Sequence, residues 1–229
     1  MPEHQLDDAR IPVFAINLKH RIDRYESIKQ EFLGKPEFNV EIVEGLSHEL
    51  KTVSLWQTIK GIIRSNLQDT ADFIIICEDD HQFTDHYNPS QLLQHIHEAR
   101  VCGADILCGG ISSCKNGIRI SNSLFWVERF TGLQFSVIFK KFFPEILSAH
   151  FGEYDVADHK ISSLTDKKFV VHPFISIQKE FGYSDVTVIN NNTGRVEQLF
   201  KDTSEKLDIL RKVSEFYIKK NNLYESNRL

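Results

Sequence analysis

Hydrophobic and polar residues follow two different periods along the first third of the chain. Two apolar runs of strand length, residues 13–18 and 40–43, are followed by a third at 72–77, which is apolar from its second residue onward. Between the runs, residues 23–32 and 51–66 carry apolar side chains at helical spacing. Because a continuous apolar run is typical of a strand buried on both faces, the pattern predicts a β-α-β-α-β opening with a buried third strand.

The first of these helices carries signals for both of its ends. Asp23 and Glu26, three residues apart, resemble a capping box, and Gly34 follows the last apolar position. Its buried face would contain Tyr25, Ile28 and Phe32. The second helix would bury Leu55, Trp56, Ile59, Ile62 and Ile63.

The middle of the chain predicts a mixture of strands and helices. A helix around residues 92–96 precedes a strand at 104–108, and further strands are expected at 132–136 and 169–171. Asn116-Gly117, flanked by isoleucines, is a strong signal for the two-residue turn of a β-hairpin. The sheet should therefore be mixed and not purely parallel.

The end of the chain predicts a closing helix. Residues 195–221 interleave charges with apolar side chains, so an amphipathic helix is expected with Leu199, Leu207, Leu210, Val213 and Tyr217 on its apolar face. The complete pattern predicts an α/β fold, a twisted mixed sheet with helices on both faces. One domain over residues 1–229 is expected, with a polar tail at 1–10.

Composition and charge exclude some classes of function. The net charge of -5 argues against a general nucleic-acid binder. Residues 1–10 have no apolar signal region, and no run approaches the roughly 20 apolar residues of a membrane span, so a cytoplasmic protein is expected. The four cysteines contain no CxxC pair, which favours reduced structural thiols over zinc or disulfides.

Candidate chemistry is concentrated where the third apolar run ends. Glu78, Asp79 and Asp80 follow it at once, at the edge where open α/β sheets bind ligands. Two interpretations remain open: a solvated acidic turn, or carboxylates that hold Mg²⁺ or Mn²⁺ bridging to a diphosphate. His172 follows the predicted strand at 169–171 and is either a structural residue or a further ligand, in which case imidazole would favour Mn²⁺.

Two anchors of the sequence resemble a known family. Residues 13–24, which read VFAINLKHRIDR, are similar to the opening of glycosyltransferase family 25, the lipopolysaccharide and collagen glycosyltransferases. Leu55-Trp56 followed by the apolar strand and Glu78-Asp79-Asp80 is similar to the second anchor of that family. A looser similarity covers residues 170–178 and Ser184-Asp185. The segment 44–48 departs from the family pattern, because the expected Gly-Cys-x-x-Ser-His is missing.

The resemblance implies an enzyme of the GT-A fold that uses a nucleotide sugar, with a UDP-sugar as the first expectation. It implies an inverting, Mn²⁺- or Mg²⁺-dependent transfer to a hydroxyl of a glycan or glycolipid acceptor. Bacterial lipopolysaccharide or surface-glycan synthesis would follow, in the cytoplasm at the inner face of the membrane. Asp80 would bind the metal, Glu78 or Asp79 would contact ribose or a metal-bound water, with Glu78 a further candidate ligand, and His172 would match the C-terminal histidine ligand of several GT-A enzymes.

Further residues complete the expected site. Asn17 and Leu18 would lie against the nucleotide, and Arg21 or Arg24 could reach phosphate with a fork of donors, although a helix-entry surface explains both arginines equally well. Gln134 could line the sugar pocket or belong to a core strand. Two aspartates at the start of a helix near residues 153–162 either include the acceptor base or merely cap and solvate that helix. Asp158 is the first choice for the base, because the residues that follow it, 159–162, resemble the Asp-x-x-x-Ser segments of such enzymes. Asp155 is expected to cap the helix.

Two alternatives come from other classes. A catalytically silent nucleotide-sugar or glycan-binding module could keep the same fold without the base. A metal-dependent phosphohydrolase or nucleotidyltransferase could use the acidic triplet, but it should show further acids or histidines at other strand ends. Only His172 and the region of Asp155 offer any.

Overall fold

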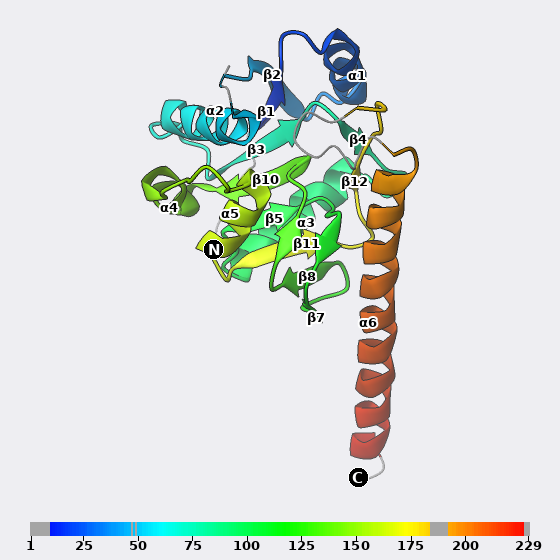
Figure 1. Cartoon of the computed structure of the whole chain (residues 1–229). Helices are drawn as coiled ribbons and strands as arrows, with labels where there is room; N and C mark the ends of the chain where they lie inside the picture. The colour runs from blue at the N-terminus through cyan, green and yellow to red at the C-terminus, as the bar shows by residue number, and fades with distance from the viewer. Residues whose placement is uncertain (1–9, 47, 49, 184–191, 227–229) are drawn as a thin grey trace.

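A computed structural model describes residues 10–46, 48, 50–183 and 192–226. An eight-stranded mixed sheet forms its centre (Figure 1), with the strand order β2-β1-β3-β10-β5-β11-β8-β7. Two small sheets, β12-β4 and β6-β9, flank it. The strands are β1 (Ile11–Asn17), β2 (Phe38–Glu44), β3 (Phe73–Glu78), β4 (His81–Phe83), β5 (Ile106–Cys108), β6 (Ser113–Cys114), β7 (Gly117–Arg119), β8 (Leu124–Val127), β9 (Phe130–Thr131), β10 (Phe135–Phe139), β11 (Lys168–Val171) and β12 (Ser176–Gln178).

Strand direction decides which ends of the strands lie at the same edge. β1 pairs in parallel with β2 and β3, and β5 pairs in parallel with β11. β10 is inserted between β3 and β5 and is antiparallel to both. The carboxyl ends of β1, β3, β5 and β11 therefore lie along one edge of the sheet.

Helices cover both faces of the sheet, as the sequence predicts. Ile74 and Ile76 of β3 point into one core, whereas Ile75 and Cys77 point into the other. The second core contains α1 (Ile22–Phe32) and α3 (Pro89–Val101). The first contains α2 (Lys51–Ser65), the short pair η1 (Lys140–Phe142) and α4 (Phe143–Ser148), α5 (Ala157–Leu164) and the start of α6 (Arg195–Ser226). The alternation along β3 explains why its sequence is apolar from Phe73 to Cys77.

The start of α1 differs from the prediction. Its N-cap is Arg21 and no side chain caps it, so Asp23 and Glu26 do not form a capping box. Tyr25 is exposed, and Arg24 takes its place on the buried face with Ile28 and Phe32. A buried arginine interrupts the apolar pattern because it has partners across the sheet edge, described below.

The predicted hairpin turn is also misplaced. Asn116 and Gly117 join β6 to β7, which lie in different sheets. The hairpin is formed instead by β7 and β8, and Arg119 pairs with Phe125 across a turn at residues 120–123. A side-chain hydroxyl decides this position, because Ser121 Oγ accepts hydrogen bonds from the amides of Ser123 and Leu124.

The closing helix α6 is confirmed, but only its first half is packed. Leu207 is buried and Leu210 packs beside it against the sheet core. The second half of α6 extends past the rest of the structure (Figure 1), so the predicted burial of Val213 and Tyr217 is wrong, and they are 48% and 57% exposed. None of the described helices has both the length and the apolar character needed to cross a membrane.

Candidate functional site

A cleft of about 430 Å³ opens at the carboxyl ends of β1 and β3. Arg21 and Arg24 of the α1 entry and Glu78 and Asp80 of the acidic triplet line one side. Gly132 and the start of α5, including Asp158, line the opposite side. The residues after β12 and the first turn of α6 complete the cleft, so segments far apart in the sequence meet around it.

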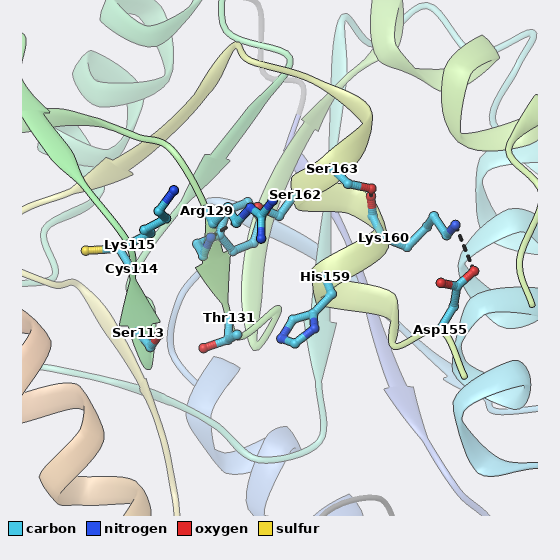
Figure 2. Close-up of a pocket in the computed structure, with 11 residues that line it drawn as sticks. Ser113, Cys114, Lys115, Arg129, Thr131, Asp155, His159, Lys160, Ser162 and Ser163 are labelled. Carbon is cyan, nitrogen blue, oxygen red and sulfur yellow. Dashed lines mark hydrogen bonds and ion pairs between the residues drawn. The ribbon is translucent and has the colours of Figure 1, made fainter. Parts of the chain in front are cut away.

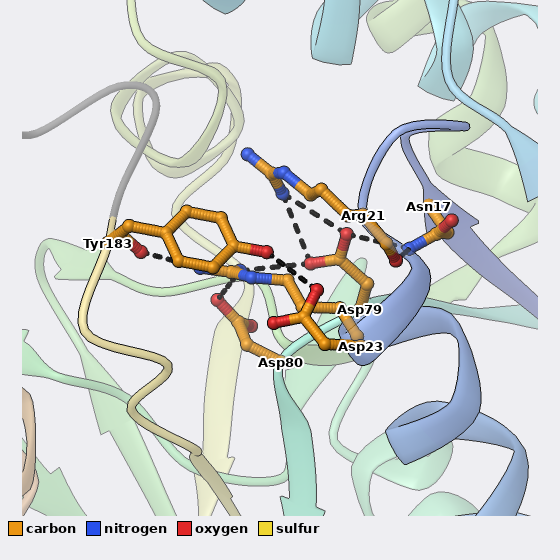
Figure 3. A network of polar contacts seen from close by, with 7 residues as sticks. Asn17, Arg21, Asp23, Asp79, Asp80 and Tyr183 are labelled. Carbon is orange, nitrogen blue, oxygen red and sulfur yellow. Dashed lines mark hydrogen bonds and ion pairs between the residues drawn. The ribbon is translucent and has the colours of Figure 1, made fainter.

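Asp79 lies beneath the cleft at the centre of a polar cluster (Figure 3). Its carboxylate accepts hydrogen bonds from Asn17 Nδ2 at 3.1 Å, Arg21 Nη1 at 3.1 and 3.2 Å, and Arg24 Nη1 at 3.0 Å. The Asp79 side chain is only 3% exposed. The expected contact of Asp79 with a ribose is therefore not what its position allows, because the carboxylate is already enclosed by three donors. We call these residues, Asn17, Arg21, Arg24 and Asp79, the arginine cluster.

The sequence gives no signal for the two aromatic rings that enclose Arg24. Its guanidinium carbon lies 4.8 Å from the ring centre of Phe181 and 4.7 Å from that of Tyr183. Arg24 Nη2 also donates to the backbone oxygen of Tyr183 at 2.7 Å, and the Tyr183 hydroxyl donates to Asp23. Cation-π contacts and hydrogen bonds thus tie the segment after β12 to α1. Ser184 and Asp185, which belong to the looser part of the family resemblance, lie outside the described residues.

The arginines do not fully offset the burial of the other two carboxylates of the triplet, and the pKa values of both are raised. Burial and the neighbouring Asp79 carboxylate raise the pKa of Asp80 to about 6, although Arg24 donates to its Oδ2 at 3.1 Å. Burial, followed by the charges of Asp80 and Asp158, raises the pKa of Glu78 well above its usual range. Asp80 Oδ1 is buried and has no hydrogen-bond partner among the described residues. The cleft therefore presents carboxylates whose charged forms are disfavoured in the absence of a cation.

The residues fit a divalent cation held by two carboxylates. Within the described part of the chain, no three His, Cys, Asp or Glu side chains are grouped as a complete ligand set. Mg²⁺ and Mn²⁺ at a diphosphate need only one or two protein carboxylates, since phosphate and water oxygens fill the other positions. Asp80, with its unpartnered Oδ1, and Glu78 could supply these two ligands.

His172 does not join them, and of the two interpretations that the sequence leaves open its contacts favour the structural residue over the further ligand. It follows β11, which lies three strands from β3, a distance of roughly 14 Å at the usual strand spacing. The His172 side chain packs edge-on against Phe125 and Phe174, and its Nε2 lies 3.2 Å from both Ser204 oxygens on α6. The helix α6 covers this strand end, so the imidazole is a structural contact between the sheet and α6.

Two other predicted contacts change, those of Asn17 and Gln134, whereas Leu18 lies beside the cleft. Asn17 is buried and binds Asp79 and the Arg21 backbone oxygen, so it positions the arginine cluster and does not line the cleft. Gln134 is completely buried beneath the cleft and donates to the Gly110 carbonyl at 2.8 Å, so it belongs to the core and not to a sugar pocket. Leu18 does line a hollow of about 60 Å³ beside the cleft, close to Gly45.

Asp158 lies in the cleft, opposite the acidic triplet. Its Oδ2 accepts a hydrogen bond from the Gly132 amide at 3.0 Å, and its Oδ1 accepts from the His159 amide at 2.7 Å. Gly132 has a φ of 101°, and a Cβ at this position would lie 2.9 Å from Gln134 Oε1, so the turn that presents this amide requires glycine. Each carboxylate oxygen keeps a second acceptor position for a hydroxyl.

Asp155 is neither a helix cap nor part of the cleft. The N-cap of α5 is Val156, without a side-chain hydrogen bond. Asp155 Oδ2 instead accepts from the Gly152 amide at 2.8 Å and forms an ion pair with Lys160 at 2.7 Å. These hydrogen bonds, to Lys160 first and then to Gly152, lower the pKa of Asp155. Of the two candidate bases, only Asp158 shares the cleft with Glu78 and Asp80.

Comparison with known proteins supports the fold alone. The sequence matches no protein family and no curated protein. Among solved structures, the A197 protein from STIV superposes with a TM-score of 0.51 at 15% identity, covering 75% of this chain and 86% of that chain. An apo UDP-glucose pyrophosphorylase (TM-score 0.43, 9% identity, 85% and 82% coverage) and HddC from Yersinia pseudotuberculosis (0.42, 12%, 85% and 77%) are more distant, and their similarity carries no conclusion about function.

Proposed function

We propose that this protein is a glycosyltransferase that moves a sugar from a nucleotide-sugar donor to a hydroxyl of a glycan or glycolipid acceptor. The resemblance to glycosyltransferase family 25 motivates the proposal and its finer terms: a UDP-sugar donor, inversion at the sugar, and a role in lipopolysaccharide or surface-glycan synthesis on the cytoplasmic face of the membrane. The two anchors of that resemblance, residues 13–24 and Glu78-Asp79-Asp80, meet at the cleft.

The observation that carries the proposal is the presence of two separate chemical groups in one cleft. Arginine and carboxylate side chains from α1 and β3 form one wall, and Asp158 from α5 faces them. A transferase needs a site for a diphosphate and, separately, a carboxylate for the acceptor proton. A binding module needs no such second carboxylate.

The residues suggest a simple division of roles. The acceptor oxygen would form a bond to the anomeric carbon while the bond from that carbon to the diphosphate oxygen breaks. Asp158 would take the hydroxyl proton, and Arg21, which lines the cleft, would lie near the departing diphosphate. A divalent cation at Glu78 and Asp80 would supply additional positive charge for that leaving group.

The test begins with the donor. A thermal-shift screen of UDP-, GDP- and CMP-sugars with and without Mn²⁺ identifies what the folded protein binds, because ligands of the folded state raise its stability. Donor hydrolysis and transfer are then measured for the unmutated protein, for Asp158→Asn and for Asp166→Asn. Asp166 is exposed on the loop after α5 and receives the same chemical change, so it is the matched control.

Asp158→Asn should lower turnover by roughly 10²- to 10⁴-fold, since the amide keeps the shape of the side chain but cannot accept the proton. Donor binding should persist in this variant, and Asp166→Asn should behave as the unmutated protein. Normal turnover in Asp158→Asn would remove it as the base. Donor binding without transfer or hydrolysis by the unmutated protein, over a broad set of acceptors, would favour the silent binding module instead.

A further inference from the structure

A second pocket adjoins the cleft beside α5. It has a volume of about 540 Å³ and lies between β6, β9 and α5 (Figure 2). Thr131 and His159 line both this pocket and the cleft, and the His159 ring points toward Thr131. We call it the lateral pocket. Because the two spaces share Thr131 and His159, a molecule bound at Asp158 in the cleft can extend into the lateral pocket.

Residues of α5 line both spaces. Asp158 faces the cleft, whereas Ser162 and Ser163, one turn further along, face the lateral pocket. Asp158 and His159 are consecutive, so the boundary between the spaces lies directly beside the proposed base. An acceptor sugar that places a hydroxyl at Asp158 would direct its neighbouring sugar past His159 into the lateral pocket.

The charges of the lateral pocket are opposite to those of the triplet. Lys115, Arg129 and Lys160 line it, with Asp155 as the one carboxylate among its lining residues. The two lysines already have partners: Lys115 pairs with Glu128 and Lys160 with Asp155, each at 2.7 Å. The side chain of Arg129 forms no hydrogen bond or ion pair with the residues that the structure describes.

The groups around Arg129 complement an anion. Its guanidinium offers a planar fork of donors that matches the two oxygens of a carboxylate or phosphate. Ser162 is buried, and its Oγ accepts the Phe130 amide at 3.1 Å, which leaves the hydroxyl proton available to donate. A neutral sugar would make little use of an exposed guanidinium, because water satisfies it as well.

We propose that the lateral pocket binds an acidic group, a carboxylate or a phosphate, carried by the acceptor next to the sugar that is modified. The substrate class is therefore an acidic glycan. That the bound molecule is a sugar acceptor rests on the proposed glycosyltransferase function. The binding of an acidic sugar itself does not require transfer to occur.

The test measures binding without a donor. The ¹⁵N-labelled full chain is titrated with glucuronate, glucose 6-phosphate, glucose and inorganic phosphate, and shifts of backbone amides and of the arginine Nε–H groups are followed by NMR. Glucuronate and glucose 6-phosphate should shift the signals of Arg129, Thr131 and Ser162, and glucose should not. The two acidic sugars distinguish a carboxylate from a phosphate source.

Variants assign the effect to one side chain. Arg129→Gln should weaken the binding of the preferred acidic sugar by about tenfold or more, and Arg129→Lys, which keeps the charge but loses the fork, should be intermediate. Arg64→Gln makes the same change at an exposed position on α2 that does not line either space, and it should have no effect.

Several results would overturn the inference. These are equal affinity in Arg129→Gln and the unmutated protein, equal shifts with glucose, shifts confined to residues outside the pocket, or inorganic phosphate binding as tightly as glucose 6-phosphate. A failure of the proposed function gives a different pattern: no nucleotide sugar binds, whereas acidic sugars still bind at Arg129. Where transfer is measurable, Arg129→Gln should raise KM for acidic acceptors and leave kcat unchanged.

Discussion

The carboxyl ends of β3 and β11 look alike in the sequence but have opposite surroundings in the structure. Each strand contains a buried apolar run that ends in polar residues, the acidic triplet that begins with the last residue of β3 and His172 directly after β11. Around β3, the entry of α1 and the start of α5 leave a cleft. Around β11, α6 packs over the strand end and the Ser204 oxygens contact the imidazole.

The two strand ends differ in what their polar side chains can reach: Glu78 and Asp80 line the cleft, whereas His172 is only 1% exposed and contacts α6, although its strand end borders another hollow of about 480 Å³. The covered His172 contacts Ser204 and aromatic rings, and its Nδ1 is buried without a hydrogen-bond partner in the described residues. The three acids of the triplet have different surroundings. Asp79 is enclosed by Asn17, Arg21 and Arg24, whereas Glu78 and Asp80 line the cleft. Four measurements on three residues test this difference.

The largest effect on stability is expected at Asp79. Asp79→Asn removes the charge that the buried Arg24 and the partly buried Arg21 share, so we expect a loss of about 3–5 kcal/mol of unfolding free energy in urea denaturation. Asp72→Asn is the matched control at the other end of β3, where an exposed pair with Arg100 should contribute less than about 1 kcal/mol. Similar losses in both variants would show that the arginine cluster does not stabilise the fold.

Replacing Asp80 should have the opposite effect on stability at neutral pH, a gain and not a loss. Its folded pKa of about 6 lies above the ordinary value of 3.8, so the folded state holds its proton more tightly than the unfolded state. Stability is therefore lost as the pH rises from about 4 to 6. In a buffer with a metal chelator, Asp80→Asn should gain about 1–3 kcal/mol at pH 7.5 and much less at pH 4, measured by urea denaturation.

The same variant tests the metal. If Asp80 holds a cation at the donor phosphates, Asp80→Asn should lose the Mn²⁺-dependent part of UDP binding in calorimetry while the fold remains intact. Unchanged Mn²⁺-dependent affinity would end this assignment, and a loss of stability at pH 7.5 would show that the Asp80 charge is compensated in the folded protein.

The smallest effect is expected at His172. Burial lowers its pKa below the ordinary 6.5, so the unfolded state takes up a proton first and stability is lost as the pH falls below about 6.5. His172→Gln should cost about 1 kcal/mol at pH 7.5 through lost ring contacts, and it should flatten the decline of stability between pH 7 and 5. Enzymatic activity should not change, and a loss of Mn²⁺ dependence in His172→Gln would contradict the structural role.

The sequence by itself determined the main elements and the edge at which the chemistry lies. The uninterrupted apolar run of β3 requires burial on both faces, and helical spacing in α2 and the first half of α6 requires packing on one face. Both signals are local, because the hydrophobic effect acts on each residue according to its own side chain. The edge then follows from strand direction, which placed the acidic triplet and the α1 entry side by side.

Only the tertiary structure decided what each polar residue does. The sequence cannot tell that Arg24 replaces Tyr25 on the buried face, that Gln134 turns into the core, or that Asp155 faces away from the cleft. Each outcome depends on partners distant in the chain: Asp79 and Tyr183 for Arg24, Gly110 for Gln134, and Gly132 for Asp158. The physical reason is that a polar side chain is buried or exposed according to whether its hydrogen bonds are satisfied there, and those partners are brought together only by the complete fold.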